Sequence, residues 1–315
     1  MKKALAIIIS TALTLTLLAA CGSSEPEPTP APAPADTTTT IADPAPADPD
    51  PAPADPDPGD GFDTSRVIGA HTREDGSGTR DAFVSITGVG DDMYSEAVIL
   101  ASTNEILSAV GANDYAIGYI SVGSLNDSVK ALTIGGVAPS DATIKNGSYI
   151  IQRPLLVCVT DEKYADPLIK DFIDFMLSAT GQEQSATSWT SVDDSAPDYE
   201  SSGMAGILRI GGSTSVDPLM QRMREEYLKL NDGVTIDISS TGSGAGISGA
   251  AEGELDIGMS SRELREAELE TLMPINIALD GVAVVVNPAN PISDLSLEQV
   301  KDIYTGEIVR WEQLQ

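Results

Sequence analysis

Proline is concentrated near the N-terminus, and this limits how much of the chain can build a core. Twelve of its 20 prolines lie between Gly22 and Asp63, in repeats such as Ala-Pro and Asp-Pro. Proline lacks a backbone donor and fixes φ, so such a segment favours extended polyproline II over a packed domain. The 315-residue chain therefore predicts a tether over residues 21–63, followed by a folded part of about 250 residues.

Residues 1–20 have the layout of an export signal. Two lysines precede an apolar stretch from Leu5 to Leu18, which is short for a membrane span. The stretch ends in Leu18-Ala19-Ala20-Cys21, and small residues before a cysteine resemble a lipobox, in which the thiol is acylated. We therefore expect lipidation of Cys21 and a lipid anchor on the outer face of a bacterial cytoplasmic membrane. Ordinary cleavage with a free Cys21 is the alternative.

Charge and composition argue against several classes of function. The chain has 48 acidic and 18 basic residues, which argues against nucleic acid and anionic lipid surfaces as partners. A small anion stays compatible with this charge, because salt screens exposed charges beyond about 8 Å. His71 is the only histidine, and Cys158 lies in an apolar stretch. We therefore expect neither a metal site nor a cofactor nor a Ser-His-Asp triad.

Short apolar stretches alternate with helical ones after Thr64, which predicts an α/β fold. The expected strands cover residues 67–72, 116–121, 130–134, 150–159, 207–210, 234–239, 255–259 and 277–287. Helices are expected to begin at Asp166-Pro167, Asp217-Pro218 and Ser296, because a capping residue at the start and an early proline both favour a helix. Gly181 is expected to end the first of these helices, and residues 185–203 are expected to form a linker or surface loop.

Three loops rich in Gly, Ser and Thr each lie between an expected strand and an expected helix. They are Arg73–Thr79, Gly211–Ser215 and Thr241–Gly246. Glycine lets a ligand approach the backbone, and a helix start presents free N–H groups and a partial positive charge. Such corners bind anions, whereas no Walker A lysine and no regular Gly-x-Gly-x-x-Gly is present to favour a nucleotide. The loops therefore predict a site for a tetrahedral oxyanion.

With these loops, the sequence resembles the phosphate-binding proteins of bacterial phosphate ABC importers. Further matching segments are Asp256–Arg262, Leu279–Asn287, Tyr304–Ile308 and Ile117–Ile120, and the resemblance spans residues 64–315 apart from the polar segment 185–203. It implies a two-lobed fold of the type II periplasmic-binding-protein kind, with a hinge and an interlobe cleft. It also implies capture of inorganic phosphate and delivery to a membrane permease. The contacts that it implies fall on Thr214, Ser215, Ser243, Arg73, Ser77, Gly78 and Thr79, with Arg73 as the charged, bidentate donor.

Ser261 departs from the pattern of some family members, which have an aspartate there that accepts a proton from the ligand. A serine hydroxyl also accepts, so Ser261 stays in the expected site, but selectivity against sulfate is left open. Binding of another oxyanion such as sulfate is one alternative, and a surface lipoprotein that has lost binding is another. An enzyme, such as a phosphatase that uses Ser77 or Ser243, is disfavoured because no base is evident beside either serine.

The order of the loops along the chain is third, first, second relative to the family. There the loop that matches Gly212–Val216 comes first, whereas here the Arg73–Thr79 loop precedes it. This order indicates a circular permutation in which the former termini are joined through residues 185–203. It predicts one lobe from residues 64–149 plus 288–315 and the other from 150–287. The alternative is a fusion of two half-genes, whose halves pair between chains or not at all.

Overall fold

The computed structural model describes residues 61–314. The expected export signal over residues 1–20, lipidation at Cys21 and nearly all of the expected tether lie outside the described residues. Within the described range, no helix is both long enough and apolar enough to cross a membrane.

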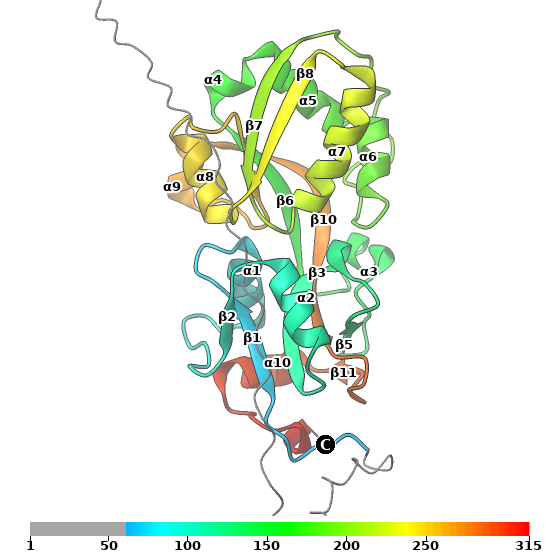
Figure 1. The fold of residues 1–315 in the computed structure, drawn as a ribbon, viewed down its shortest axis with the longest axis vertical. Helices are drawn as coiled ribbons and strands as arrows, with labels where there is room; N and C mark the ends of the chain where they lie inside the picture. Colours follow the sequence, from blue (N-terminus) through cyan, green and yellow to red (C-terminus); the bar gives the residue numbers. More distant parts are fainter. Residues whose placement is uncertain (1–60, 315) are drawn as a thin grey trace, which may run out of the picture. The chain divides into compact units, whose positions relative to one another are not determined.

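The described part has a mixed α/β fold, which confirms the predicted fold class, and one sheet runs through two lobes (Figure 1). Along the sheet the strand order is β2-β1-β3-β10-β6-β9-β7-β8, and β4 pairs with β10. The bounds are β1 Gly69–Arg73, β2 Val98–Leu100, β3 Ala116–Ser121, β4 Lys130–Ala131, β6 Gln152–Val159, β7 Gly206–Gly212, β8 Val234–Ser240, β9 Ile257–Ser260 and β10 Met273–Val286. A separate parallel pair joins β5 (Thr133–Ile134) to β11 (Asp294–Leu295).

Strand β10 connects the two lobes. Its residues 273–281 pair antiparallel with β6, and residues 282–286 pair antiparallel with β3. Ile277 and Ala278 belong to one hydrophobic core, whereas Val282 and Val284 belong to another. We call the part built around β6–β9 lobe one and the part built around β1–β5 and β11 lobe two.

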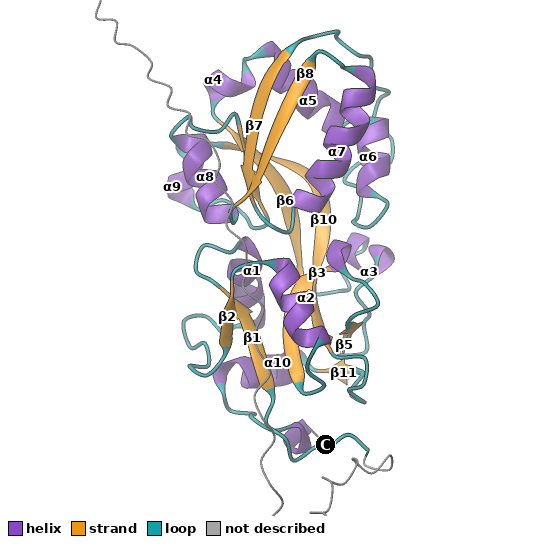
Figure 2. Ribbon diagram, viewed as in Figure 1, coloured by secondary structure: helices purple, strands orange, loops and turns teal. Residues whose placement is uncertain are grey.

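Helices cover the strands in both lobes (Figure 2). Those of lobe one are α4 Asp161–Tyr164, α5 Pro167–Met176, α6 Ala179–Ser185, α7 Asp217–Leu230, α8 Ser243–Ala251 and α9 Glu266–Leu269. Those of lobe two are α1 Gly78–Thr87, α2 Thr103–Gly111, α3 Asp141–Lys145 and α10 Leu297–Thr305. Two short 3-10 turns cover Val122–Ser124 and Trp311–Leu314.

Aromatic packing in lobe two fixes the start of α1. Phe83 of α1 stacks on Tyr119 of β3 with the ring centroids 3.9 Å apart, and its edge meets Tyr304 of α10 at 4.8 Å. All three side chains are fully buried. Burial of a large apolar side chain contributes on the order of 1.5–3 kcal/mol, so this cluster holds α1, and with it the loop that precedes α1, against the sheet.

Gly181 does not end α5 as predicted. The helix stops at Met176, and the Ser178 hydroxyl begins a second helix, α6, by accepting a hydrogen bond from the Gly181 N–H at 3.3 Å. A Cβ at Gly181 would lie 2.3 Å from the carbonyl oxygen of Phe175. Glycine at this position therefore allows α6 to turn tightly against the end of α5.

The polar stretch 185–203 is more firmly packed than a linker. Trp189 is 3% exposed, and Thr190 is fully buried and forms a β-bridge with Leu279. The Ala179 N–H also donates to the carbonyl of Pro197 at 2.7 Å. This stretch therefore packs along lobe one, a contact that its polar composition did not reveal.

Candidate anion-binding site

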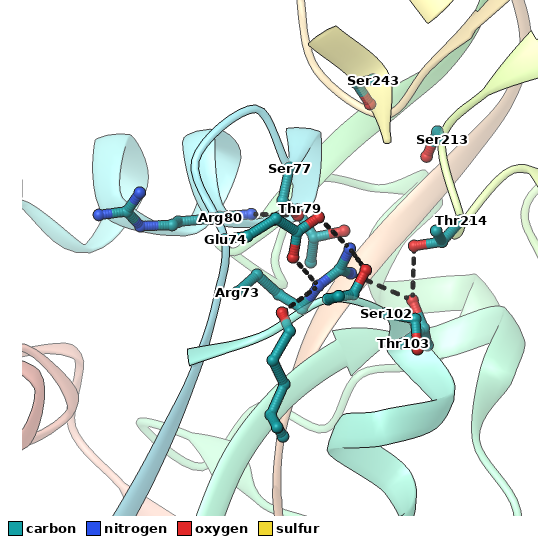
Figure 3. Close-up of polar contacts among 12 residues, drawn as sticks. Arg73, Glu74, Ser77, Thr79, Arg80, Ser102, Thr103, Ser213, Thr214 and Ser243 are labelled. Carbon is teal, nitrogen blue, oxygen red and sulfur yellow. Dashed lines mark hydrogen bonds and ion pairs between the residues drawn. The ribbon is translucent and has the colours of Figure 1, made fainter. Parts of the chain in front are cut away.

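The three Gly/Ser/Thr loops meet where the two lobes face each other (Figure 3). Arg73 ends β1, and Ser77 caps α1 by accepting a hydrogen bond from the Arg80 N–H. From lobe one, the loop after β7 leads into α7 and the loop after β8 leads into α8. A helix therefore starts at each corner, and its first N–H groups have no partners within the helix.

Direct contacts close the junction between the lobes. The hydroxyls of Thr79 in lobe two and Ser215 in lobe one lie 2.8 Å apart. The Gly244 N–H donates to the carbonyl oxygen of Gly76 at 2.9 Å. Arg73, Thr79, Ser215 and Ser243 are each no more than 2% exposed. The structure is therefore the closed arrangement of the two lobes, with its polar groups removed from bulk water.

Gly78 lets α1 approach the hydroxyls of lobe one. A Cβ at this position would lie 2.3 Å from the Ser243 Oγ and 2.8 Å from the Ser261 Oγ. Distances under 3 Å between such atoms force something to move. A side chain at the first position of α1 would therefore displace these serine side chains or separate the lobes.

Ser261 belongs to a chain of buried hydroxyls in lobe one. Its Oγ accepts a hydrogen bond from the Ser213 Oγ at 2.9 Å and lies 3.4 Å from the Ser243 Oγ. The Ser243 Oγ in turn accepts from the Ser261 N–H at 3.1 Å. Hydroxyls both donate and accept, so this chain offers a ligand either kind of partner.

The guanidinium group of Arg73 is already held by lobe two. Its Nε and Nη2 each donate to one carboxylate oxygen of Glu74 at 2.9 Å. The Nε also reaches the carbonyl of Leu100 at 3.3 Å, and the Nη2 reaches that of Ala101 at 3.2 Å. The remaining nitrogen, Nη1, has only a long contact, to the Thr103 Oγ1 at 3.5 Å. Glu74 neutralises the charge of Arg73. Attraction of an anion to this site would therefore depend mainly on directed N–H and O–H donors.

A fully buried ion pair lies behind Ser261 at the crossing between the lobes. Arg153 of β6 and Asp280 of β10 are directly paired in the sheet, with Nη2 and Oδ2 2.9 Å apart. Arg153 also donates to the carbonyl oxygen of Ser261 at 3.2 Å, while the Ser121 hydroxyl donates to Asp280 at 2.9 Å. Burial raises the pKa of the Asp280 carboxyl, and the charge and hydrogen bonds of Arg153 oppose this rise.

A second set of ion pairs bridges the lobes beside the site. Asp81 of α1 lies 2.9 Å from the Nε of Arg262 and 3.0 Å from the Nη2 of Arg265. Arg262 also makes two 2.7 Å hydrogen bonds to Glu268, and these lower the pKa of the Glu268 carboxyl. The two arginines of lobe one therefore meet a carboxylate of lobe two when the lobes are closed.

Side chains that can ligate metals, and one thiol, lie within the described part. No set of three or more His, Cys, Asp or Glu side chains within residues 61–314 is arranged to hold a metal ion. Cys158 is fully buried, and burial raises the pKa of its thiol to about 12, so the reactive thiolate is not populated near neutral pH.

The three loops singled out in the sequence meet at this junction, together with residues that the sequence did not single out. Thr103 and the Arg153–Asp280 pair were not among the expected residues, and Ser213 lies in an expected loop without being an expected contact. The sequence does contain a signal for the start of α2, where Thr103 lies. Ser102 and Glu105 have the spacing of a capping box before the apolar positions of that helix. Arg153 and Asp280 are 127 residues apart, and no local pattern in the sequence connects them.

Two α/β lobes that close over hydroxyl and backbone donors define the class of two-lobed solute-binding proteins. A family model described as a PBP superfamily domain matches residues 64–180 and 185–315. The chain is 42% identical over 259 residues to "Phosphate-binding protein PstS 2" of Streptococcus pneumoniae serotype 4, which covers 79% of this chain and 88% of that protein. The chain therefore belongs to the PBP superfamily, in the family of bacterial phosphate-binding proteins.

Two further comparisons concern a solved structure and a second relative. The crystal structure of a phosphate-binding protein of a phosphate ABC transporter from Streptococcus pneumoniae TIGR4 matches with a TM-score of 0.66 and 42% identity, over 79% of this chain and all of that one. The "Phosphate-binding protein PstS" of Bacillus subtilis is 32% identical over 143 residues, which is 44% of this chain and 47% of that protein.

Proposed function

We propose that this protein captures inorganic phosphate between its two lobes, outside the cytoplasm, and delivers it to the membrane permease of an ABC importer. The observation that carries the proposal is the meeting of three helix-opening corners at one buried junction, closed by the 2.8 Å contact between Thr79 and Ser215. The names of the relatives that match over most of their length support phosphate as the ligand.

The proposed contacts come from both lobes. They are Thr214, Ser215, Ser243 and Ser261 from lobe one, and Arg73, Ser77, Gly78 and Thr79 from lobe two. A hydrogen bond to a charged group contributes about 1.5–3 kcal/mol, and micromolar binding needs about 8 kcal/mol. Several such donors are sufficient for micromolar binding after the costs of ordering and desolvation.

Binding without catalysis is part of the proposal, and no cofactor is included. The hydroxyls of Ser77 and Ser243 contact backbone groups and other hydroxyls in the described part, with no carboxylate or imidazole bonded to either. Glu74, in the same loop as Ser77, accepts two hydrogen bonds from Arg73. A serine in these surroundings lacks the base that would activate it as a nucleophile.

Selectivity between phosphate and sulfate follows from the hydroxyl chain at Ser261. A protonated phosphate oxygen needs an acceptor, which sulfate does not, and the hydroxyls of Ser243 and Ser261 can supply one. We therefore propose phosphate as the preferred ligand, with sulfate as the alternative. Competition calorimetry decides between them: sulfate that displaces phosphate at equal concentration contradicts the preference.

Membrane attachment is proposed through Cys21 after removal of residues 1–20, with residues 21–63 as the tether. The protein would then stay on the outer face of the cytoplasmic membrane. Metabolic labelling with an alkyne fatty acid tests this proposal. Label on the wild-type protein that disappears in Cys21→Ser supports the anchor, and equal label on both contradicts it.

We also propose that the chain is circularly permuted, with lobe boundaries near 149/150 and 287/288. The relative from Streptococcus pneumoniae aligns over 88% of its length, whereas that from Bacillus subtilis aligns over 47%. A linear alignment stops halfway when one chain begins in the middle of the other, so this difference supports the proposal. Rotating the sequence to begin near residue 203 should extend the alignment with the Bacillus subtilis protein to both halves, and no extension would contradict the permutation.

Calorimetric titration of the purified protein with phosphate tests the function directly. We expect the wild type to bind, and we expect Arg73→Met to bind about 10- to 100-fold more weakly because a charged donor is lost. Arg224→Met removes the same charge from α7 outside the site contacts and should bind like the wild type. No heat with the wild type contradicts the proposed function, and equal binding by Arg73→Met contradicts the role of Arg73.

A further inference from the structure

A fourth strand–helix corner lies against two of the three loops, those of Arg73 and of Thr214–Ser215. It runs from the end of β2 through Ala101 and Ser102 into the start of α2 (Figure 3). Strand β2 pairs in parallel with β1 so that Leu100 is the partner of Arg73. The carbonyls of Leu100 and Ala101 accept from the Arg73 guanidinium, at 3.3 and 3.2 Å. This corner therefore packs directly against the charged donor.

Local hydrogen bonds fix the shape of the corner. The Ser102 Oγ caps α2 by accepting from the Glu105 N–H at 3.2 Å, and the Glu105 carboxylate accepts from the Ala101 N–H at 2.8 Å. These two bonds set Thr103 as the first residue of the helix. The Thr103 side chain consequently projects from a fixed position toward the loops of lobe one, as its contacts with Thr214 and Ser215 demonstrate.

The hydroxyl of Thr103 is buried but has only long contacts. Thr103 is 3% exposed, and its Oγ1 lies 3.4 Å from the Thr214 Oγ1, 3.4 Å from the Ser215 Oγ and 3.5 Å from the Arg73 Nη1. Hydrogen bonds between hydroxyls normally have oxygens about 2.7–2.8 Å apart, as Thr79 and Ser215 do. A buried hydroxyl without a short partner is unfavourable, and a ligand oxygen would supply that partner.

We infer that Thr103 is a phosphate-binding residue contributed by this fourth corner, an inference that rests on the proposed function. Its three neighbours are all residues proposed to hold the anion: Arg73 belongs to the corner after β1, and Thr214 and Ser215 belong to the corner after β7. The Thr103 hydroxyl donates to an oxygen of the ligand, and its contact with the Arg73 Nη1 helps to aim the charged donor. Thr103 thereby adds a donor from lobe two beside Arg73, facing Thr214 and Ser215 of lobe one.

Two substitutions at Thr103 distinguish the contribution of its hydroxyl to phosphate binding from that of its methyl group. Thr103→Val keeps the shape and loses the donor, and Thr103→Ser keeps the donor and loses the methyl group. We expect phosphate affinity, measured by calorimetry, to fall about 10-fold in Thr103→Val and to stay within about 3-fold of the wild type in Thr103→Ser. As a matched control, Thr87→Val removes the hydroxyl of another buried threonine, which bonds to the Phe83 carbonyl outside the site, and should bind phosphate like the wild type.

The outcomes distinguish the inference from the proposed function. Wild-type affinity in Thr103→Val overturns the inference, and so does a Thr103→Ser protein as weak as Thr103→Val, because packing and not the hydroxyl would then matter. Thermal unfolding without phosphate checks folding: Thr103→Val should unfold near the wild-type temperature and gain less stability from added phosphate. Absence of phosphate binding by the wild type overturns the proposed function, and this inference with it.

Discussion

Gly78 illustrates how a single residue controls the closed state. It is the first residue of α1 and faces the Ser243 and Ser261 hydroxyls across the lobe junction, where even one methyl group would meet atoms at 2.3 and 2.8 Å. The pattern Gly76-Ser77-Gly78 marked this loop in the sequence as an anion corner. The structure adds a second reason for the glycine, which is the close approach of the opposite lobe.

We predict that Gly78→Ala weakens phosphate binding by about 5- to 150-fold, because overpacking costs roughly 1–3 kcal/mol and would oppose closure. Calorimetry measures the change. Gly61→Ala is the control, since a Cβ at Gly61 meets no atom within 4 Å. Wild-type affinity in Gly78→Ala would show that closure at this point is not needed.

The buried pair Arg153–Asp280 makes a different prediction, on stability. Arg153→Met leaves the carboxylate of Asp280 buried without its partner, which should lower the free energy of unfolding by about 3–5 kcal/mol at neutral pH. The double variant Arg153→Met/Asp280→Leu removes both charges and should recover much of this loss. Denaturant titration measures both variants, and equal stability of the two would contradict the pairing.

The same variant has a defined dependence on pH. Burial already raises the pKa of Asp280, and without Arg153 the folded-state pKa rises further above its unfolded value. A group with a raised folded-state pKa is stabilising at low pH and loses that contribution as the pH rises. The deficit of Arg153→Met should therefore shrink as the pH falls toward the ordinary range of an aspartate. A deficit that is constant with pH would contradict this cause.

At the scale of elements, the long and strongly patterned segments were predictable. Strand β3 was predicted over residues 116–121 as observed, and the helix expected after Asp166-Pro167 is α5, with Asp166 as its cap. Strand β2 was missed because it has three residues, of which Val98 and Ile99 are about half or more exposed, and so shows no alternation. Since β2 leads into α2, the fourth corner and Thr103 were missed with it.

The orientation of side chains at the site could not be predicted from the sequence. Arg73 was expected as a bidentate donor to the ligand, but the pairing with the neighbouring Glu74 depends on the rotamers of both side chains. The serine chain through Ser213, Ser243 and Ser261 likewise depends on three separate loops meeting. The local pattern predicted which loops contribute to an anion site, and only tertiary packing determines which of their polar atoms already have protein partners.

The elements α1 and α9 suggest a test of how the lobes are held closed. Asp81 of α1 meets Arg262 and Arg265, which lie between β9 and α9. We predict that Asp81→Asn weakens phosphate binding by up to about 5-fold at low salt, because partly exposed ion pairs contribute roughly 0.2–1 kcal/mol. The difference should diminish at high salt.

Asp174→Asn is the matched control for this prediction. Asp174 pairs with Lys170 within α5, and both side chains are about half exposed. Calorimetry at two salt concentrations should give wild-type affinity for Asp174→Asn throughout. If Asp81→Asn also matches the wild type at low salt, the interlobe ion pairs do not stabilise the closed state.

On the scale of the whole molecule, the site depends on residues far apart in the chain. Thr79 and Ser215 are 136 residues apart, yet their hydroxyls touch across the lobe junction. Strand β10 makes this possible because it contributes to the cores of both lobes. In this arrangement one chain supplies all the proposed contacts, so the alternative of halves that pair between chains is not required for a complete site.

The most direct test of this account is the stoichiometry of phosphate binding by a protein of known mass. Light scattering establishes the mass of the purified species, and calorimetry counts the phosphate ions bound to it. The account predicts a monomer that binds one phosphate with an enthalpy change. A monomer that binds none, or binding that occurs only in a dimer, would contradict the claim that one chain closes its two lobes around phosphate.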